Sequence, residues 1–119
     1  MDLTLIKGDT HTITFKIKTA DDSYFMLQSE DRLYFTVKKN FYTKDVILQK
    51  TYKNGITYNA INKEYIIKLN QDCTCDIDCG GYVYDIKIAI AQEDGDFVVK
   101  TLVKGSLGFV PNATHKENE

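Results

Sequence analysis

The sequence lacks tryptophan and has only one proline, two histidines and three cysteines among its 119 residues. One proline and seven glycines exclude a collagen-like chain or a proline-rich linker. No apolar run approaches the roughly 20 residues that cross a bilayer, and the first residues lack the basic and apolar regions of a signal peptide. We therefore expect a soluble protein that is made in the cytosol and does not interact with membranes.

The chain also lacks an excess of charge of either sign. Fifteen Lys and Arg residues stand against seventeen Asp and Glu residues, which gives a formal net charge of -2. This balance disfavours nucleic acid as a partner. The 43% of hydrophobic residues supplies enough apolar material for one packed domain. We place that domain at residues 1–111 and expect residues 112–119 to be a flexible polar tail.

Residues for catalysis are scarce. General acid–base and nucleophilic mechanisms most often use histidine, and the chain offers only His11 and His115. No nucleophile elbow, P-loop or dinucleotide fingerprint occurs, and Gly80 and Gly81 precede a predicted strand rather than a helix. The sequence therefore predicts a protein that is not an enzyme and that holds no cofactor.

The three cysteines, Cys73, Cys75 and Cys79, lie within one short segment. They cannot all pair within one chain, so we expect reduced thiols. They could bind zinc with His11 or a carboxylate as the fourth ligand, and the aspartates of the same segment could bind calcium, but neither spacing matches a known ligand pattern. The favoured interpretation is a connecting loop without metal, in which one or two cysteines pack inward as small apolar residues.

Alternation of apolar and polar residues dominates the chain and predicts strands with one buried face. The alternating segments are 12–18, 33–38, 65–69 and 81–91. Further strands are expected at 46–53, 56–60 and 97–103, followed by a short last strand that ends at Pro111. Asn54-Gly55 predicts a type I′ hairpin, and residues 93–96 predict another turn. Residues 20–31 are expected to form a short helical turn or an irregular loop.

These segments predict an all-β fold, namely an antiparallel immunoglobulin-like β-sandwich of about seven to nine short strands with Greek-key connections; a small barrel is the alternative. The segment around Gly80 matches the pattern that precedes strand F of immunoglobulin domains. Tyr82 would then be the tyrosine-corner residue, with a buried ring and a hydroxyl bonded to the loop backbone. Tyr84 would occupy the position of the disulfide cysteine. We assign structural roles to Gly80, Tyr82 and Tyr84.

Aromatic pairs in predicted loops are candidates for contacts with a partner. Phe41 and Tyr42 lie between two predicted strands, where they either fold back as a lid or meet another protein. The segment 24–26, Tyr-Phe-Met, raises the same question. Ala89 and Ala91 are expected on the outward face of the longest strand, where small side chains would let another sheet approach.

Four segments resemble the immunoglobulin-like N-terminal domain of phage baseplate upper proteins and related small tail or minor structural proteins of phages and prophages. They begin with Ile-Lys-Gly-Asp-Thr at 6–10 and Leu-Tyr-Phe-Thr-Val-Lys at 33–38. They continue with Gly-Gly-Tyr-Val-Tyr-Asp-Ile at 80–86 and with the closing segment 100–109.

The resemblance implies a non-enzymatic structural component of a tail or baseplate that acts through protein–protein contacts. Its partners would be other tail or baseplate proteins, with a homo-oligomer possible, and its location would be the virion tail after synthesis in the bacterial host cytoplasm. A carbohydrate-binding or surface-binding β-sandwich module is the alternative, although the absence of tryptophan weakens it.

Overall fold

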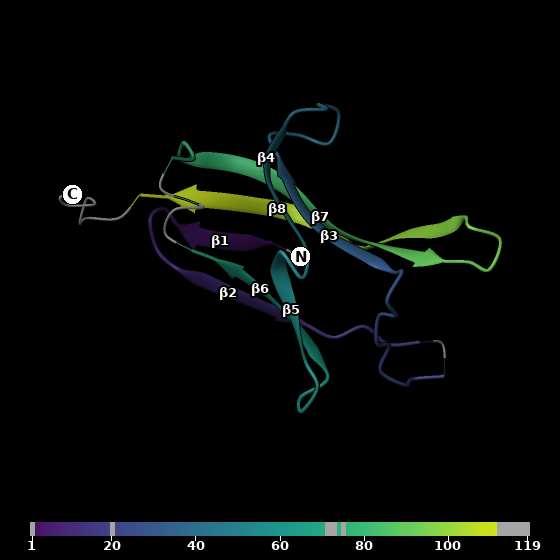
Figure 1. Cartoon of the computed structure of the whole chain (residues 1–119). Helices are drawn as coiled ribbons and strands as arrows, with labels where there is room; N and C mark the ends of the chain where they lie inside the picture. Colours follow the sequence, from purple (N-terminus) through teal and green to yellow (C-terminus); the bar gives the residue numbers. More distant parts are fainter. Residues whose placement is uncertain (1, 20, 71–73, 75, 112–119) are drawn as a thin grey trace.

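The computed structural model describes residues 2–19, 21–70, 74 and 76–111, which form an all-β domain (Figure 1). Its first four strands are β1 (Leu3–Ile6), β2 (His11–Phe15), β3 (Arg32–Lys38) and β4 (Val46–Tyr52). The others are β5 (Gly55–Asn59), β6 (Glu64–Leu69), β7 (Gly80–Ala91) and β8 (Phe97–Val110). The segments with alternating polarity became strands β2, β3, β6 and β7, as the sequence predicted.

The strands join in one mixed sheet with the order β1-β8-β7-β3-β4-β5-β6-β2. Figure 1 shows this sheet curling over itself, nearly into a barrel. Most neighbours are antiparallel, but β1 pairs with β8 and β4 pairs with β5 in parallel. The expectation of a wholly antiparallel sheet is therefore wrong at these two pairs.

Inward side chains of nearly every strand fill the space enclosed by the curled sheet. On β3, Leu33, Phe35 and Val37 are fully buried, because every second residue of a strand points to the same face. Tyr65 on β6 is the centre of an aromatic cluster in the same core. Its ring centroid lies 5.5 Å from Phe15 and 4.8 Å from Tyr58.

Asn54-Gly55 does not form the predicted hairpin. Positive φ angles occur at Lys53 (73°) and Gly55 (103°), on either side of Asn54, whereas a type I′ turn needs them at two adjacent residues. The chain makes a tight loop and β5 leaves β4 to pair with β6, which brings buried Ile56 opposite buried Ile67. Burial of this apolar pair outweighs the local preference of the dipeptide.

The two last predicted strands are one strand, β8, which pairs with β7 from Phe97 to Phe109. Gly105 and Gly108 lie within it rather than ending it, and the register shifts once, between Ile86 and Lys87. Strand β2, in contrast, is shorter than the predicted strand 12–18, because it ends at Phe15. The described residues of the segment 20–31 form an irregular loop.

Candidate contact surfaces

The corner before β7 has the geometry that its sequence pattern predicts. The Tyr82 side chain is 6% exposed, and its hydroxyl donates a hydrogen bond to the carbonyl oxygen of Asp78 at 2.6 Å. Burial, and then the nearby Asp78 and Cys79, raise the pKa of this hydroxyl. The Lys39 ammonium covers the outer side of the ring at 4.7 Å from its centroid. Gly80 has a φ of 142°, which favours glycine at the start of the strand.

Tyr84, two residues further along the same face, is 2% exposed, and its ring centroid lies 5.9 Å from that of Phe35. Burial raises the pKa of its hydroxyl, and the charge of Asp2 contributes less. Both tyrosines therefore belong to the core, consistent with the structural roles assigned to them.

Phe41 and Tyr42 occupy the loop between β3 and β4. The Tyr42 side chain is 97% exposed, so it does not fold back as a lid. Phe41 is half exposed, and the ammonium of Lys104 lies 5.5 Å from its ring centroid. The side-chain oxygen of Asn40 accepts hydrogen bonds from the backbone nitrogens of Tyr42 and Thr43, which holds the loop in a turn. The loop therefore presents Tyr42 to solvent from an ordered backbone.

Ala89 is not on an open surface, and its assignment as a contact residue is wrong. Its side chain is 6% exposed, because Arg32 and Val99 flank it on the neighbouring strands. The guanidinium of Arg32 also extends over the ring of Phe97, 4.6 Å from its centroid. Ala91, two residues further along, is partly exposed.

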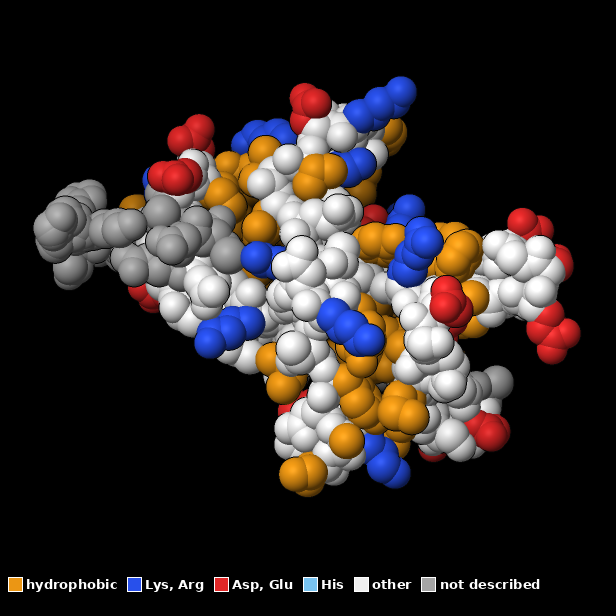
Figure 2. Space-filling view, in the orientation of Figure 1, with side chains coloured by type: hydrophobic (Ala, Val, Ile, Leu, Met, Phe, Trp, Pro, Cys, Tyr) orange, Lys and Arg blue, Asp and Glu red, His pale blue; other side chains and the backbone are white. Residues whose placement is uncertain are grey.

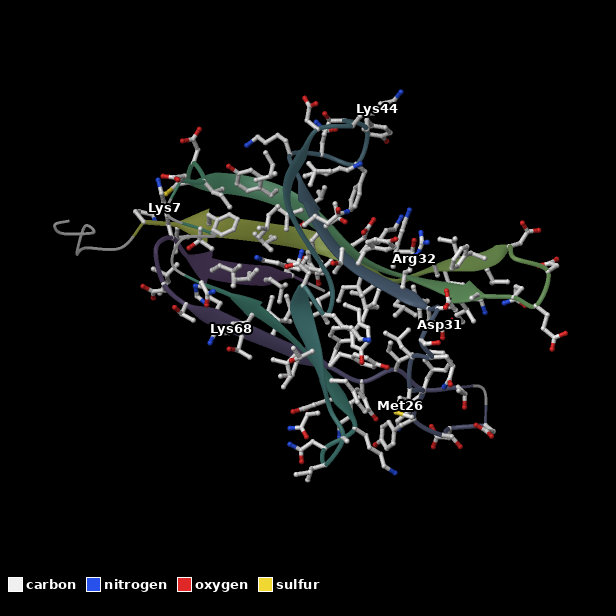
Figure 3. The ribbon with its side chains drawn as sticks, viewed as in Figure 1. Lys7, Met26, Asp31, Arg32, Lys44 and Lys68 are labelled. Carbon is white, nitrogen blue, oxygen red and sulfur yellow. The ribbon has the colours of Figure 1, made fainter. Side chains whose placement is uncertain are left out.

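The surroundings of these alanines form a feature that we call the arm, residues 89–99. Strands β7 and β8 continue as a two-stranded ribbon past Ala89, where pairing with β3 ends. Figure 1 shows this ribbon projecting beyond the rest of the domain, and Figure 2 shows acidic side chains at its tip. Figure 3 places Asp31 and Arg32 at its base.

The arm exposes apolar side chains on both faces. Phe97 is 36%, Val98 42% and Val99 60% exposed, although consecutive residues of a strand point to opposite sides. Its outer edge is also open: β1 joins β8 only from Leu107 onward, and no other described strand pairs with that edge between Phe97 and Ser106. Open apolar edges of this kind readily accept another strand.

Asp31 fixes the base of the arm. Its side chain is 7% exposed, and one carboxylate oxygen accepts a hydrogen bond from the backbone nitrogen of Ala91 at 2.9 Å. The other accepts from the backbone nitrogen of Gln28, also at 2.9 Å. Asp31 directly precedes β3, so its carboxylate binds the backbone of β7 just past the point where pairing between β3 and β7 stops.

A hollow of about 480 Å³ lies beside the segment 24–26. Its lining includes Tyr24, Met26, Tyr58 and Lys63. The ammonium groups of Lys16, Lys18 and Lys63 lie 5.2, 5.3 and 5.8 Å from the centroid of the Tyr24 ring. Of the three, Lys18 forms an ion pair with Asp22 at 3.5 Å. The hollow therefore combines aromatic faces with positive charge.

The candidate metal ligands are not brought together among the described residues. Cys79 is exposed and free, and His11 Nε2 lies 3.0 Å from the backbone nitrogen and carbonyl oxygen of Ile6. Cys73, Cys75 and His115, like the predicted tail 112–119, lie outside the described residues. Within the described ranges, no three His, Cys, Asp or Glu side chains are grouped as metal ligands.

No helix among the described residues has the length and hydropathy to span a membrane.

Neither the models of known protein families nor the curated proteins contain a match to this chain.

The arm escaped prediction from the sequence, although one signal of it was present. Phe97-Val98-Val99 is apolar at three consecutive positions, where a strand with one solvent-facing side would alternate. The exposed position of these residues depends on β3 being seven residues long and β7 twelve. Such a mismatch between paired strands becomes visible only once their register is known.

Proposed function

We propose that this chain is a non-enzymatic structural component of a phage or prophage tail or baseplate, acting through protein–protein contacts from an immunoglobulin-like β-sandwich. The arm is the observation that carries the contact part of this proposal. An isolated two-stranded ribbon is marginally stable in water, and apolar side chains exposed on both of its faces gain stability when a partner covers them.

The strand pairing supports the immunoglobulin-like part of the proposal. Strands β2, β6 and β5 form one group, which is antiparallel throughout, and β1, β8, β7, β3 and β4 form the other, which is antiparallel except for the pair of β1 and β8. Only Thr51 and Tyr52 of β4 pair across to β5, so the link between the two groups is slight. The hydrogen bond from Tyr82 to Asp78 further supports this fold, because a tyrosine corner recurs in such domains.

The phage-tail part of the proposal is supported by the resemblance of the four sequence segments. Two of them, residues 80–86 and 100–109, lie on β7 and β8, the strands that extend into the arm. A rigid domain of this kind would contribute shape and exposed strand edges, and repetition within a symmetric assembly would multiply weak individual contacts.

The test is capture of proteins encoded by neighbouring genes, using the tagged chain as bait. We expect tail proteins to be captured by the wild type and lost with the double variant Phe97→Ser, Val99→Ser. Truncating central contact residues typically costs about 2 kcal/mol or more, roughly a thirtyfold loss of affinity. A second bait, Phe41→Ala with Tyr42→Ala, tests the exposed loop, and both baits must keep the wild-type melting temperature.

Undiminished capture by the arm variant would contradict a role of the arm, and loss with the loop variant would instead move the contact to Tyr42. If no bait captures a tail protein, the proposed function is wrong.

A second candidate, a carbohydrate-binding or surface-binding module, is favoured by one observation. Tyrosine faces stack on sugar rings, and the lysines around Tyr24 suit a ligand that also carries negative charge. Binding of acidic and neutral oligosaccharides to the wild type and to Tyr24→Ala, measured by calorimetry, tests it. Specific binding that the variant loses would favour this candidate over the tail protein.

A further inference from the structure

The open edge of β8, together with the residue before it, carries a self-complementary sequence. From residue 96 to residue 100 it reads Asp-Phe-Val-Val-Lys, with an acid at one end, a base at the other and three apolar residues between. When two such strands run antiparallel about a two-fold axis at Val98, each Asp96 faces a Lys100 of the other copy. Neither side chain forms an ion pair with another described residue.

The backbone N–H and C=O groups along β8 point in the directions that antiparallel pairing about an axis at Val98 requires. The backbone nitrogen of Gln92 donates to the carbonyl oxygen of Asp96 at 2.8 Å, so the carbonyl of Asp96, just before β8, points toward the β7 side of the ribbon. Because these groups alternate along a strand, those of Phe97 and Val99 point outward to the open edge. The two-fold axis at Val98 places Phe97 opposite Val99 of a second copy, which is the position where hydrogen bonds can form.

The side chains also match across this axis. Phe97 would meet Val99 of the second copy on one face, beside the partly exposed Ala91. On the other face Val98 would meet Val98, beside Ile90, its partner on β7. Pairs of aromatic and β-branched residues are among the favourable cross-strand pairs. Shifting the axis by one residue, to Val99, would place Val98 opposite Lys100 and leave Asp96 without its base.

We propose that two copies of this chain join through the outer edges of their β8 strands, antiparallel about a two-fold axis at Val98. The two arms then form a continuous sheet, and each ribbon gains neighbouring strands that its own domain does not supply. This inference rests on the proposed function, since it names a second copy as the partner of the arm. The register shift between Ile86 and Lys87 ends the regular ribbon beside Thr101 and limits the paired segment to about these five residues.

The test is analytical ultracentrifugation of wild type, Asp96→Lys and Lys100→Glu. We expect wild type to form a concentration-dependent dimer. Each single variant places like charges opposite each other twice and should weaken the dimer about thirtyfold. An equimolar mixture of the two variants restores both opposite-charge pairs, and it should dimerise as wild type does. Glu93→Lys, in the turn between β7 and β8, and Lys87→Glu, on β7, reverse exposed charges outside the paired segment and should have little effect.

A wild type that stays monomeric, single variants that dimerise normally, or a mixture that fails to restore the dimer would each overturn this inference. Its failure is distinct from failure of the proposed function. A monomer that still captures tail proteins through its arm overturns the dimer alone, and a dimer that captures none overturns the tail assignment alone.

Discussion

The hydroxyl of Tyr65 accepts a hydrogen bond from the backbone nitrogen of Leu27 at 2.9 Å and donates one to the carbonyl oxygen of Phe25 at 3.2 Å. A fully buried side chain of β6 therefore supplies polar partners to the irregular loop that precedes β3. Since that loop has little regular backbone pairing of its own, the tyrosine holds its end against the core.

We expect Tyr65→Phe to lower the free energy of unfolding by about 1 to 3 kcal/mol, because the buried Leu27 nitrogen loses its acceptor while the ring packing remains. Urea denaturation measures the loss. Tyr34→Phe, at a less buried tyrosine of β3, is the matched control and should change stability by less than about 0.5 kcal/mol. Equal values for the two variants would show that the loop does not depend on Tyr65.

Stability should fall in alkaline solution. Burial raises the pKa values of Tyr65, Tyr82 and Tyr84 above their ordinary value of 10.0, so the folded state keeps protons that the unfolded chain releases. The stabilisation is fully present below pH 10 and is lost as the pH rises from there through the raised pKa values. Melting temperatures between pH 8 and pH 12 measure this loss, and Tyr65→Phe should make the dependence shallower. A melting temperature that stays constant up to pH 12 would contradict it.

Substitutions of Tyr82 measure how much the corner before β7 contributes to the free energy of unfolding. Tyr82→Phe removes only the hydrogen bond to Asp78 and should cost about 0.5 to 1.5 kcal/mol, whereas Tyr82→Ala also empties a buried ring site and should cost about 3 to 5 kcal/mol. Denaturant titration of both variants separates the two contributions. Small and equal losses would mean that the ring does not support the fold.

Asp31→Asn should loosen the base of the arm. The amide keeps one acceptor oxygen but turns an NH₂ group toward either the Ala91 or the Gln28 nitrogen, which should cost about 1 to 3 kcal/mol. Hydrogen exchange should accelerate at Ala91 or Gln28 while remaining slow in the middle of β7. Glu30→Gln, at the exposed neighbouring position, is the control. Unchanged exchange at both nitrogens would show that Asp31 does not secure the arm.

The period of the apolar residues was sufficient to predict most strands and their buried faces. Leu33, Phe35 and Val37 alternate with more exposed residues because a strand repeats every two residues, and this period depends on no distant partner. Long-range pairing decided what sequence reasoning missed. The dipeptide Asn54-Gly55 favours a hairpin locally, yet burial of Ile56 opposite Ile67 determines where the chain goes.

The candidate contact residues also separate into those that local sequence locates and those that depend on long-range pairing. Local sequence placed Tyr42 in a loop but left open whether its side chain folds back as a lid or faces solvent, and the structure shows it exposed. Ala89 was misplaced because its burial depends on the side chains of two neighbouring strands, and the arm was missed because it depends on the unequal lengths of β3 and β7.

The parallel pairing of β1 with β8 has a mechanical consequence. Leu3 lies beside Leu107 and Ile6 beside Val110, so the chain enters β1 at one end of this pair and leaves β8 at the other. A pulling force applied before Leu3 and after Val110 acts along the strands and loads the hydrogen bonds between them together, in shear. An antiparallel pair loaded at adjacent ends would open one bond at a time. Strands β1 and β8 therefore resist tension transmitted along the chain, because the hydrogen bonds between them must break together.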